Sequence, residues 1–208
     1  MPKIALVDSG VGNLHSAHKA LEATGAEVVL TTDAHLLAAA DGVVLPGVGA
    51  FDAAVTRLRA LGLVQPLADL VAARRPLLGI CLGLQVLFES SEEGREPGLG
   101  LLPGRVRRFS DEPGLTIPHM GWNRLEFDQL DCPLWRGLAP GSWVYFVHSF
   151  YVDPAEAADR AASCLHGSQR FTAAIARDCL WAVQFHPEKS AATGLRIIEN
   201  FVATVAAR

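Results

Sequence analysis

The segment Pro76-Leu-Leu-Gly79-Ile-Cys81-Leu-Gly83-Leu-Gln85 decides the fold. It joins an apolar run typical of a buried strand directly to the start of an apolar segment with helical spacing. Cys81 stands at the junction, and small residues two positions before and after it relieve crowding in a sharp strand-to-helix turn, as in the G-x-S-x-G pattern of hydrolases. The segment therefore predicts a nucleophile elbow in an α/β protein, where the helix start favours the thiolate.

Short aliphatic runs alternate with longer amphipathic segments on both sides of this elbow, which predicts a parallel sheet with covering helices. We expect strands at 3–8, 27–31, 42–45 and 76–80, and helices at 13–23, 51–61 and 82–89. Beyond residue 103, shorter segments predict antiparallel strands near 104–109, 123–127, 143–151, 161–166, 171–176 and 180–185, followed by a closing helix at 195–205. The whole pattern predicts one α/β domain over residues 1–208, with a mixed, mostly parallel central sheet flanked by helices.

Composition excludes several classes of protein. The 208 residues are 50% hydrophobic and 19% charged, which is far from the composition of disordered chains. The formal net charge is −4 and basic residues cluster only in pairs, so nucleic acid is not an expected partner. The start of the chain lacks the apolar core of a secretory signal, and no stretch is suited to span a membrane, so we expect a cytoplasmic protein. The cysteines show no C-x-x-C pairing, which argues against a disulfide framework or a zinc site.

A second constellation lies at the end of the last predicted strand, in Gln184-Phe-His186-Pro-Glu188-Lys-Ser190. Residues two apart in an extended segment point to the same side, so His186 and Glu188 are placed to lie together. A histidine oriented by a carboxylate, near a cysteine, is the logic of a Cys-His-acid triad. A lone histidine is more often structural or solvated, and the pairing with Cys81 is what favours a catalytic role.

Two glycine-containing segments follow predicted strands. Pro46-Gly-Val-Gly49 can turn backbone N–H groups inward and is a candidate oxyanion hole, although most such loops are simple turns. Gly10-Val-Gly12 matches half of a dinucleotide-binding fingerprint. The position of its third glycine is His15, however, and no acidic residue clearly ends the second strand, so a nucleotide site is not predicted.

Taken together, the P-G-V-G loop, the cysteine elbow and the H-P-E segment resemble the class I (triad) glutamine amidotransferases, a family with a flavodoxin-like fold, over nearly the whole chain. The resemblance implies that glutamine is the substrate, that Cys81 forms a glutamyl thioester, and that His186 and Glu188 complete the triad. It also implies an oxyanion hole at the Val48 and Leu82 N–H groups. The residues implied to hold glutamine are Gly49, Gln85, Ser149 and Phe150.

Narrower features indicate one branch of that family. The segments 8–14, Met120-Gly-Trp-Asn123, Tyr145-Phe-Val-His-Ser-Phe-Tyr151 and 184–190 look like those of the glutaminase subunits of imidazole glycerol phosphate synthases, from histidine biosynthesis. The resemblance implies a heterodimer with a (β/α)8-barrel cyclase, which uses the ammonia to make imidazole glycerol phosphate and AICAR from PRFAR. It suggests Asn13, Trp122 and Lys189 as interface residues, and it implies no cofactor and no metal.

Three alternatives stand beside this hypothesis. The chain can be a glutaminase for another synthase, such as the anthranilate or pyridoxal phosphate enzymes, although the G-W-N and H-S-F-Y segments argue against both. A second alternative is an inactive regulatory subunit. The intact set of Cys81, His186 and Glu188 argues against it. A nucleotide-binding oxidoreductase is the third alternative, and its glycine signal is weak.

Overall fold

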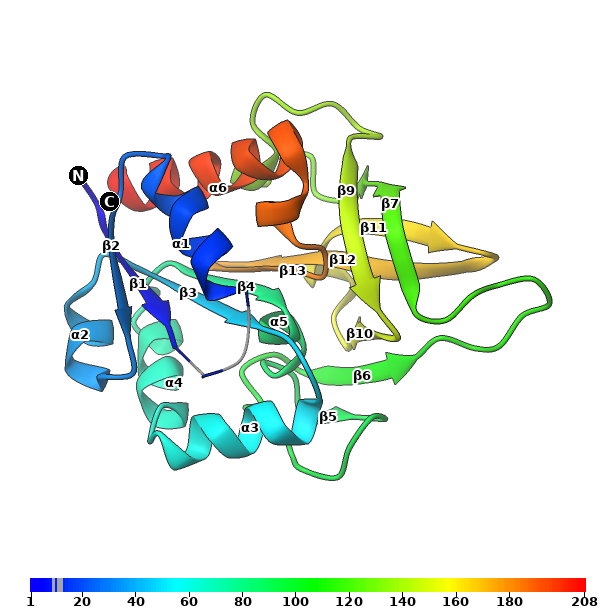
Figure 1. Ribbon diagram of the computed structural model, residues 1–208, viewed down its shortest axis with the longest axis horizontal. Coiled ribbons are helices and arrows are strands. Elements are labelled where there is room, and N and C mark those ends of the chain that lie inside the picture. The colour runs from blue at the N-terminus through cyan, green and yellow to red at the C-terminus, as the bar shows by residue number, and fades with distance from the viewer. Residues whose placement is uncertain (9, 11–12) are drawn as a thin grey trace.

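A central mixed sheet organises the chain in the computed structural model, which describes residues 1–8, 10 and 13–208 (Figure 1). Its parallel half runs in the order β2-β1-β3-β4-β13. The bounds of these strands are Lys3–Val7 for β1, Glu27–Thr31 for β2, Gly42–Gly47 for β3, Leu77–Cys81 for β4 and Leu180–Val183 for β13. Because the strands are parallel, the segments that follow β1, β3, β4 and β13 all leave the sheet at one edge.

The other half of the sheet is mostly antiparallel and continues in the order β12-β10-β6-β5, with β11 pairing β12 and β8. Here β5 runs parallel to β6. Strands β7 and β9 pair with each other and form a small separate sheet, which Figure 1 shows beside the main one. The bounds are Ser90–Ser91 for β5, Gly104–Arg108 for β6, His119–Arg124 for β7, Glu126–Phe127 for β8, Trp143–His148 for β9, Phe150–Pro154 for β10, Arg160–His166 for β11 and Gln169–Arg177 for β12.

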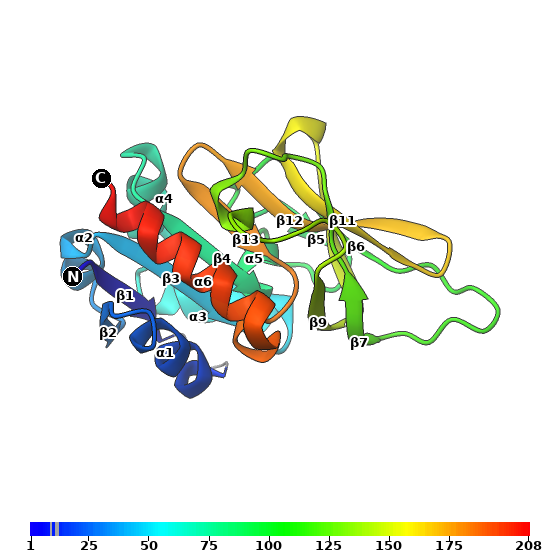
Figure 2. The same ribbon diagram turned by 90° about the horizontal axis from the view of Figure 1, so that it is seen from above.

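Helices cover both faces of the parallel half, because its strands are apolar on both sides. Ile4 and Leu6 of β1 pack with α1 and α6, whereas Ala5 and Val7 belong to the core formed with α2, α3, α4 and α5. Figure 2 shows α1 and α6 lying together across one face. The helix bounds are Leu14–Glu22 for α1, Ala34–Ala39 for α2, Phe51–Ala60 for α3, Val64–Ala72 for α4, Leu82–Gln85 for α5 and Ala191–Ala206 for α6, and short 3-10 turns lie at Pro133–Trp135, Ala157–Asp159 and Pro187–Lys189.

The α/β class and the mixed, mostly parallel sheet are confirmed, and several boundaries differ from expectation. Strand β3 extends to Gly47 instead of ending at Leu45. Helix α5 ends at Gln85, because the chain that follows turns to pair β5 with β6. The apolar run 143–151 is split at Ser149 between the two sheets, with no turn signal in the sequence to announce it. Two helices, α2 and α4, were not predicted.

None of the helices in the described part of the chain is both long enough and apolar enough to cross a membrane.

Candidate functional site

Cys81 occupies the sharp turn between β4 and α5 that the sequence predicts. Its backbone has φ 55° and ψ −112°, a conformation that L-residues rarely adopt, and the residue is 7% exposed. It is the last residue of β4 and pairs with Gly47 of β3, so the sheet fixes its place. A strained backbone held by its surroundings is a frequent mark of a functional position.

Glycines allow this turn to be so tight. A Cβ on Gly83 would lie 1.9 Å from the carbonyl oxygen of Leu45, which is an impossible contact. A Cβ on Gly79 would lie 3.0 Å from the carbonyl oxygen of Gly83. The two glycines that flank Cys81 in the sequence are therefore needed for the close approach of α5 to β3 and β4.

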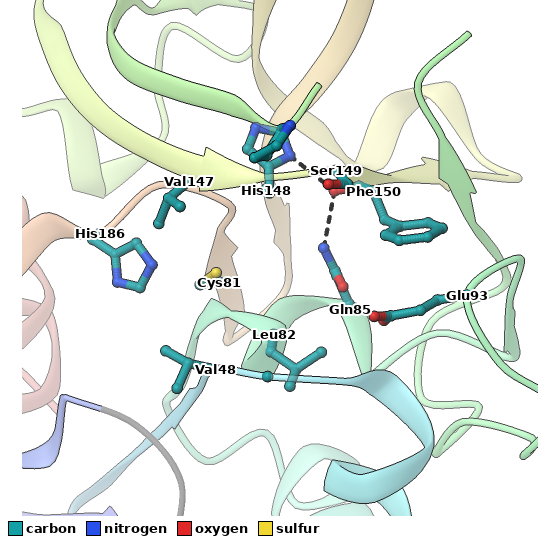
Figure 3. A pocket seen from close by; sticks show the side chains of 12 residues that line it. Val48, Cys81, Leu82, Gln85, Glu93, Val147, His148, Ser149, Phe150 and His186 are labelled. Carbon is teal, nitrogen blue, oxygen red and sulfur yellow. Dashed lines mark hydrogen bonds between the residues drawn. The ribbon is translucent and has the colours of Figure 1, made fainter. Parts of the chain in front are cut away.

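His186 and Glu188 form a buried pair just after β13. The His186 Nδ1 atom lies 2.8 Å from Oε1 of Glu188, and each side chain is only 3% exposed. The other ring nitrogen, Nε2, is buried and has no hydrogen-bond partner among the described residues. In Figure 3 the imidazole of His186 lies next to the sulfur of Cys81. The arrangement leaves one nitrogen of an oriented histidine available beside the thiol.

The backbone around this pair is anchored on both sides. The Ser190 hydroxyl accepts a hydrogen bond from the Tyr145 N–H at 2.9 Å and donates one to the His186 carbonyl at 2.6 Å. The His186 N–H donates to the Tyr145 carbonyl at 2.9 Å. A Cβ on Gly194 would lie 1.9 Å from the Pro187 carbonyl oxygen, so glycine lets α6 approach this turn. Strand β9 and helix α6 together hold His186 in place.

The electrostatics of the pair favour a protonated imidazole. Burial alone lowers the pKa of His186, but the nearby Cys81 sulfur and the Glu188 carboxylate outweigh burial and raise the pKa to about 9. A histidine of this kind can take a proton from a neighbouring thiol and remain stable as an imidazolium.

Cys81 and His186 line a cavity of about 330 Å³ together with the oxyanion and glutamine-binding residues that the family resemblance named. Figure 3 shows its lining from close by. The structure brings the expected oxyanion and glutamine-binding residues together here, and His148, Val147, Pro118 and Glu93 join them. The full lining is Val48, Gly49, Cys81, Leu82, Gln85, Glu93, Pro118, Val147, His148, Ser149, Phe150 and His186.

A buried amide links Cys81 to the expected glutamine-binding residues. Gln184 is fully buried, and its Nε2 lies 3.8 Å from the Cys81 sulfur. The Gln85 amide donates to Gln184 Oε1 at 3.1 Å and to the Phe150 carbonyl at 3.0 Å. Sequence reasoning assigned no role to Gln184. Its position two residues before His186 is the signal that was available, because both residues then point to the same side of the extended chain.

Glu93 was also missed. It is the one acidic residue among those that line the cavity, and its Oε2 accepts a hydrogen bond from the Phe51 N–H at 3.0 Å. The sequence around it, Ser90-Ser-Glu-Glu-Gly94, resembles an ordinary polar turn and carries no signal of a site. Only the fold brings this carboxylate to the cavity.

The expected interface residues lie in two places. Asn13 precedes α1 and lines a small cavity with Val48, His186 and Glu188, while Lys189 is exposed on the turn after His186. Trp122 is 50% exposed on β7 of the small sheet. Met120 is also exposed, and so is Trp143, two positions from the residue paired with Trp122. These three large apolar side chains share one face of the small sheet.

The remaining cysteines have no comparable surroundings. Cys132, Cys164 and Cys179 are buried away from the cavity lining. Burial raises the pKa of Cys132 to about 11 and that of Cys164 further, so both thiols stay protonated near neutral pH. Within the described residues no group of His, Cys, Asp and Glu side chains is arranged to hold a metal ion. The glycine segment 10–12 includes Val11 and Gly12, which lie outside the described residues.

Comparisons with known proteins agree in one family. The family model for glutamine amidotransferase class-I matches residues 5–205. Imidazole glycerol phosphate synthase subunit HisH of Gloeobacter violaceus is 72% identical over 207 residues, covering 100% of this chain and 92% of the relative. The protein of the same name from Synechococcus elongatus is 61% identical, covering 99% and 95%. The solved structure of PurLQS from Thermotoga maritima superposes with a TM-score of 0.75 at 19% identity, covering 98% of each chain, which shows the fold.

Proposed function

This chain belongs to the class-I glutamine amidotransferases, and we propose that Cys81, His186 and Glu188 are the triad with which it hydrolyses glutamine. The observation that carries the proposal is the buried His186–Glu188 pair, whose unpartnered Nε2 lies beside a strained elbow cysteine in a cavity. Nucleophile, base and orienting acid are the parts that covalent acyl transfer requires. A regulatory subunit without activity would not need the strained backbone at Cys81.

The reaction follows from these positions. His186 Nε2 takes the Cys81 proton, and the thiolate sulfur bonds to the side-chain amide carbon of glutamine. The imidazolium then protonates the amide nitrogen, the C–N bond breaks, and ammonia leaves a glutamyl thioester. His186 next takes a proton from water, which attacks the thioester carbon. The C–S bond breaks, glutamate leaves and the thiol is restored. Glu188 orients the ring throughout and stabilises its charge.

The two tetrahedral intermediates carry a negative oxygen, and the Val48 and Leu82 N–H groups are its proposed donors. Both residues line the cavity next to Cys81. Leu82 is the first residue of α5, where backbone N–H groups lack acceptors within the helix. Removal of one such donor costs about 10²–10³ in rate in other acyl-transfer enzymes.

Glutamine also has an α-ammonium and an α-carboxylate, which the cavity wall opposite His186 can bind. Glu93 is placed to pair with the ammonium, and it complements the proposed contacts from Gly49, Gln85, Ser149 and Phe150. A carboxylate is the ordinary protein partner of an ammonium group, because the ion pair and its charge-assisted hydrogen bonds form together.

The physiological role is that of the glutaminase subunit of an imidazole glycerol phosphate synthase in histidine biosynthesis. Full-length relatives at 72% and 61% identity carry that name. A subunit requires a partner, and we propose a (β/α)8-barrel cyclase that forms a heterodimer with this chain and uses the ammonia to convert PRFAR to imidazole glycerol phosphate and AICAR. Cytoplasmic location is part of the proposal, since the substrates of this pathway are intracellular metabolites.

The proposed docking surface joins Asn13 and Lys189 with the exposed face of the small sheet around Trp122. Large aromatic side chains with exposed apolar area are typical anchors of protein interfaces. Docking to the cyclase is proposed to switch glutamine hydrolysis on, because hydrolysis without an acceptor would release ammonia into water. Val48 is the element proposed to move, and its neighbour Gly49 has φ 99°, which leaves that side of the peptide open to rearrangement.

Cys81→Ala tests the triad and the partnership together. With the cyclase and PRFAR, the variant should lose synthesis from glutamine and keep synthesis from added ammonium salt. Cys132→Ala is the matched control, because its thiol is buried elsewhere, and it should keep most glutamine-dependent turnover. Loss of ammonia-dependent synthesis in Cys81→Ala would contradict the proposal that this chain only supplies ammonia.

A further inference from the structure

Two buried histidines connect strand β7 to the cavity wall through a row of hydrogen bonds. Asn123 Nδ2 lies 3.2 Å from His119 Nε2, and His119 Nδ1 lies 3.0 Å from His148 Nε2. His148 Nδ1 lies 2.8 Å from the carbonyl oxygen of Phe150. Asn123 is next to the exposed Trp122, and Phe150 lines the cavity. The row therefore runs from the proposed docking face to the substrate edge. This name denotes the part of the cavity lining that is proposed to bind glutamine, formed by Gly49, Gln85, Ser149 and Phe150.

The direction of every donor in this row is fixed by chemistry. A carbonyl oxygen only accepts, so His148 carries its proton on Nδ1 and its bare Nε2 accepts from His119. His119 then carries its proton on Nδ1 and accepts at Nε2 from Asn123. The Asn123 amide is oriented independently, because its Nδ2 also donates to the Leu165 carbonyl at 2.7 Å. One set of tautomers satisfies all of these contacts.

Both rings are neutral at physiological pH, as this set of donors requires. Burial lowers the pKa of His148 to about 3, although its bond to Phe150 opposes the change. Burial and the nearby charge of His166 lower the pKa of His119 to about 4. A second proton on either ring would place two donors face to face.

The carbonyl of Phe150 joins this row to the Gln85 side chain. It accepts from His148 and also from the Gln85 amide at 3.0 Å. The second hydrogen of that amide goes to Gln184, whose own amide lies 3.8 Å from the Cys81 sulfur. The place of the Phe150 carbonyl thus decides how the Gln85 side chain is presented beside the nucleophile (Figure 3).

We propose that His148 and His119 are positioning residues for the substrate edge: His148 holds the Phe150 carbonyl through its Nδ1 proton, and His119 acts only by keeping His148 in that tautomer. This inference rests on the proposed function, because the substrate edge is assigned there. It gives β7 a direct hydrogen-bonded route to the cavity, and it assigns a role to two histidines that the reaction itself does not use.

The test measures occupation of the site in the full-length chain, without requiring turnover. A chloroketone analogue of glutamine alkylates Cys81, and mass spectrometry of the intact chain gives the concentration for half-maximal labelling rate. Iodoacetamide, which has no amino-acid moiety, measures the reactivity of the same thiol without the substrate edge. Comparing the half-maximal concentration of the chloroketone with the rate of labelling by iodoacetamide separates the positioning of the analogue from the reactivity of the sulfur.

Four variants separate the steps of the proposal. His148→Leu removes the donor to Phe150 and should raise the half-maximal concentration about tenfold, the effect of losing about one hydrogen bond. His148→Asn keeps a donor at the δ position and should stay close to the unmodified chain. His119→Leu changes a residue outside the cavity lining. It should raise the half-maximal concentration about threefold, because the hydrogen bond from His148 to Phe150 is weakened but not removed. In the His148→Asn background, His119→Leu should have no further effect, because an amide has no tautomer to control.

His166→Leu is the matched control. The His166 ring lies 4.3 Å from the His119 ring, centroid to centroid, but its Nε2 bonds to the Thr116 carbonyl outside the row. This variant removes a packed imidazole from the same cluster and should leave the half-maximal concentration unchanged. Iodoacetamide labelling should be unchanged in all the variants.

Three outcomes would overturn the inference. In the first, His148→Leu has the same half-maximal concentration as the unmodified chain. In the second, His148→Asn does not restore that concentration. In the third, His119→Leu raises it further in the His148→Asn background. Nitrogen-15 spectra of the unmodified chain provide a test that needs no variant. They should show both rings neutral from pH 6 to 8 with the proton on Nδ1, and an Nε2 proton on either ring would contradict the proposal. If the unmodified chain is not labelled saturably at Cys81, the proposed function fails and not this inference alone.

Discussion

Nδ1 of His186 and Oε1 of Glu188 are 2.8 Å apart in a pair from which water is almost excluded. A carboxylate in this position fixes the tautomer that leaves Nε2 free. Without its charge, the imidazolium that forms during catalysis is less stable.

We expect Glu188→Gln to lower kcat/KM for glutamine by up to about 10⁴, the loss seen when the orienting acid of a serine-protease triad is changed to an amide. His186→Ala should lower it further, because no base remains. Steady-state glutamate release in the presence of the partner measures both. Turnover by Glu188→Gln equal to that of the unmodified chain would exclude Glu188 from the triad.

The same pair should make stability depend on pH. The pKa of His186 is raised to about 9 in the folded chain, against about 6.5 in the unfolded one. A raised pKa contributes stability that is fully present below pH 6.5 and is lost as pH rises through 9. Urea unfolding at pH 6 and pH 9.5 should differ by on the order of 3 kcal/mol from this source. In Glu188→Gln and in Cys81→Ala the difference should shrink, since each removes a group that raises the pKa.

Ser190 connects strand β9 to the histidine turn, and its loss should affect both stability and rate. In Ser190→Ala the Tyr145 N–H loses its acceptor in a buried place, which costs about 1–3 kcal/mol. The His186 backbone also loses the hydroxyl bond to its carbonyl, so kcat should fall while KM changes little. Ser142→Ala, at an exposed hydroxyl, is the control and should change the free energy of unfolding by less than about 0.5 kcal/mol. A normal kcat in Ser190→Ala would show that the turn needs no such anchor.

The loop after β3 gives a test of the proposed switch. Val48 stands between two glycines, but Gly47 is the last residue of β3 and pairs with Cys81, so Gly49 is the neighbour that leaves the Val48 peptide free to rotate. A Cβ on Gly49 would contact none of the described residues within 4 Å, so the cost expected for Gly49→Ala is the strain of its φ of 99°. That strain is about 1–2 kcal/mol.

Gly49→Ala should therefore lower the free energy of unfolding only slightly and leave docking unchanged. The stimulation of glutamate release by the cyclase and its ligand should fall markedly. The measurement compares glutamate release by the chain alone, with the cyclase, and with the cyclase and PRFAR. Equal rates in all three for the unmodified chain would remove the switch from the proposal and leave the triad intact.

Much of the site was predictable because its residues occupy special local positions. Cys81 lies between glycines at a strand–helix junction, and His186 and Glu188 are two residues apart at a strand end, so their chemistry and their proximity are both visible in the sequence. The apolar runs likewise located the parallel strands β1, β2, β3 and β4, since strands buried on both faces have few polar residues. The expectation for 180–185 was wrong in part: β13 pairs antiparallel with β12, as predicted, but it also pairs parallel with β4.

What the sequence did not reveal depends on contacts between distant segments. Glu93 reaches the cavity only because the chain after α5 folds back to pair with β6, and a polar turn has no periodicity that would announce this. The row of His119 and His148 exists because β7 and β9 pair in one register, with these two residues opposite each other. Local patterns carry no information about such a partner.

Alternate side chains of strand β7 point to opposite faces of the small sheet. Met120 and Trp122 are exposed on one face, while His119, at the start of the same strand, faces the interior. Since side chains alternate with a period of two, the loss or gain of a single residue within 119–124 would shift the residues beyond it to the opposite face and mix the inward-facing and outward-facing sets. Evolution can therefore change this strand only by substitution, and differences in length among relatives should fall in the flanking loops, at 110–118 and 128–142.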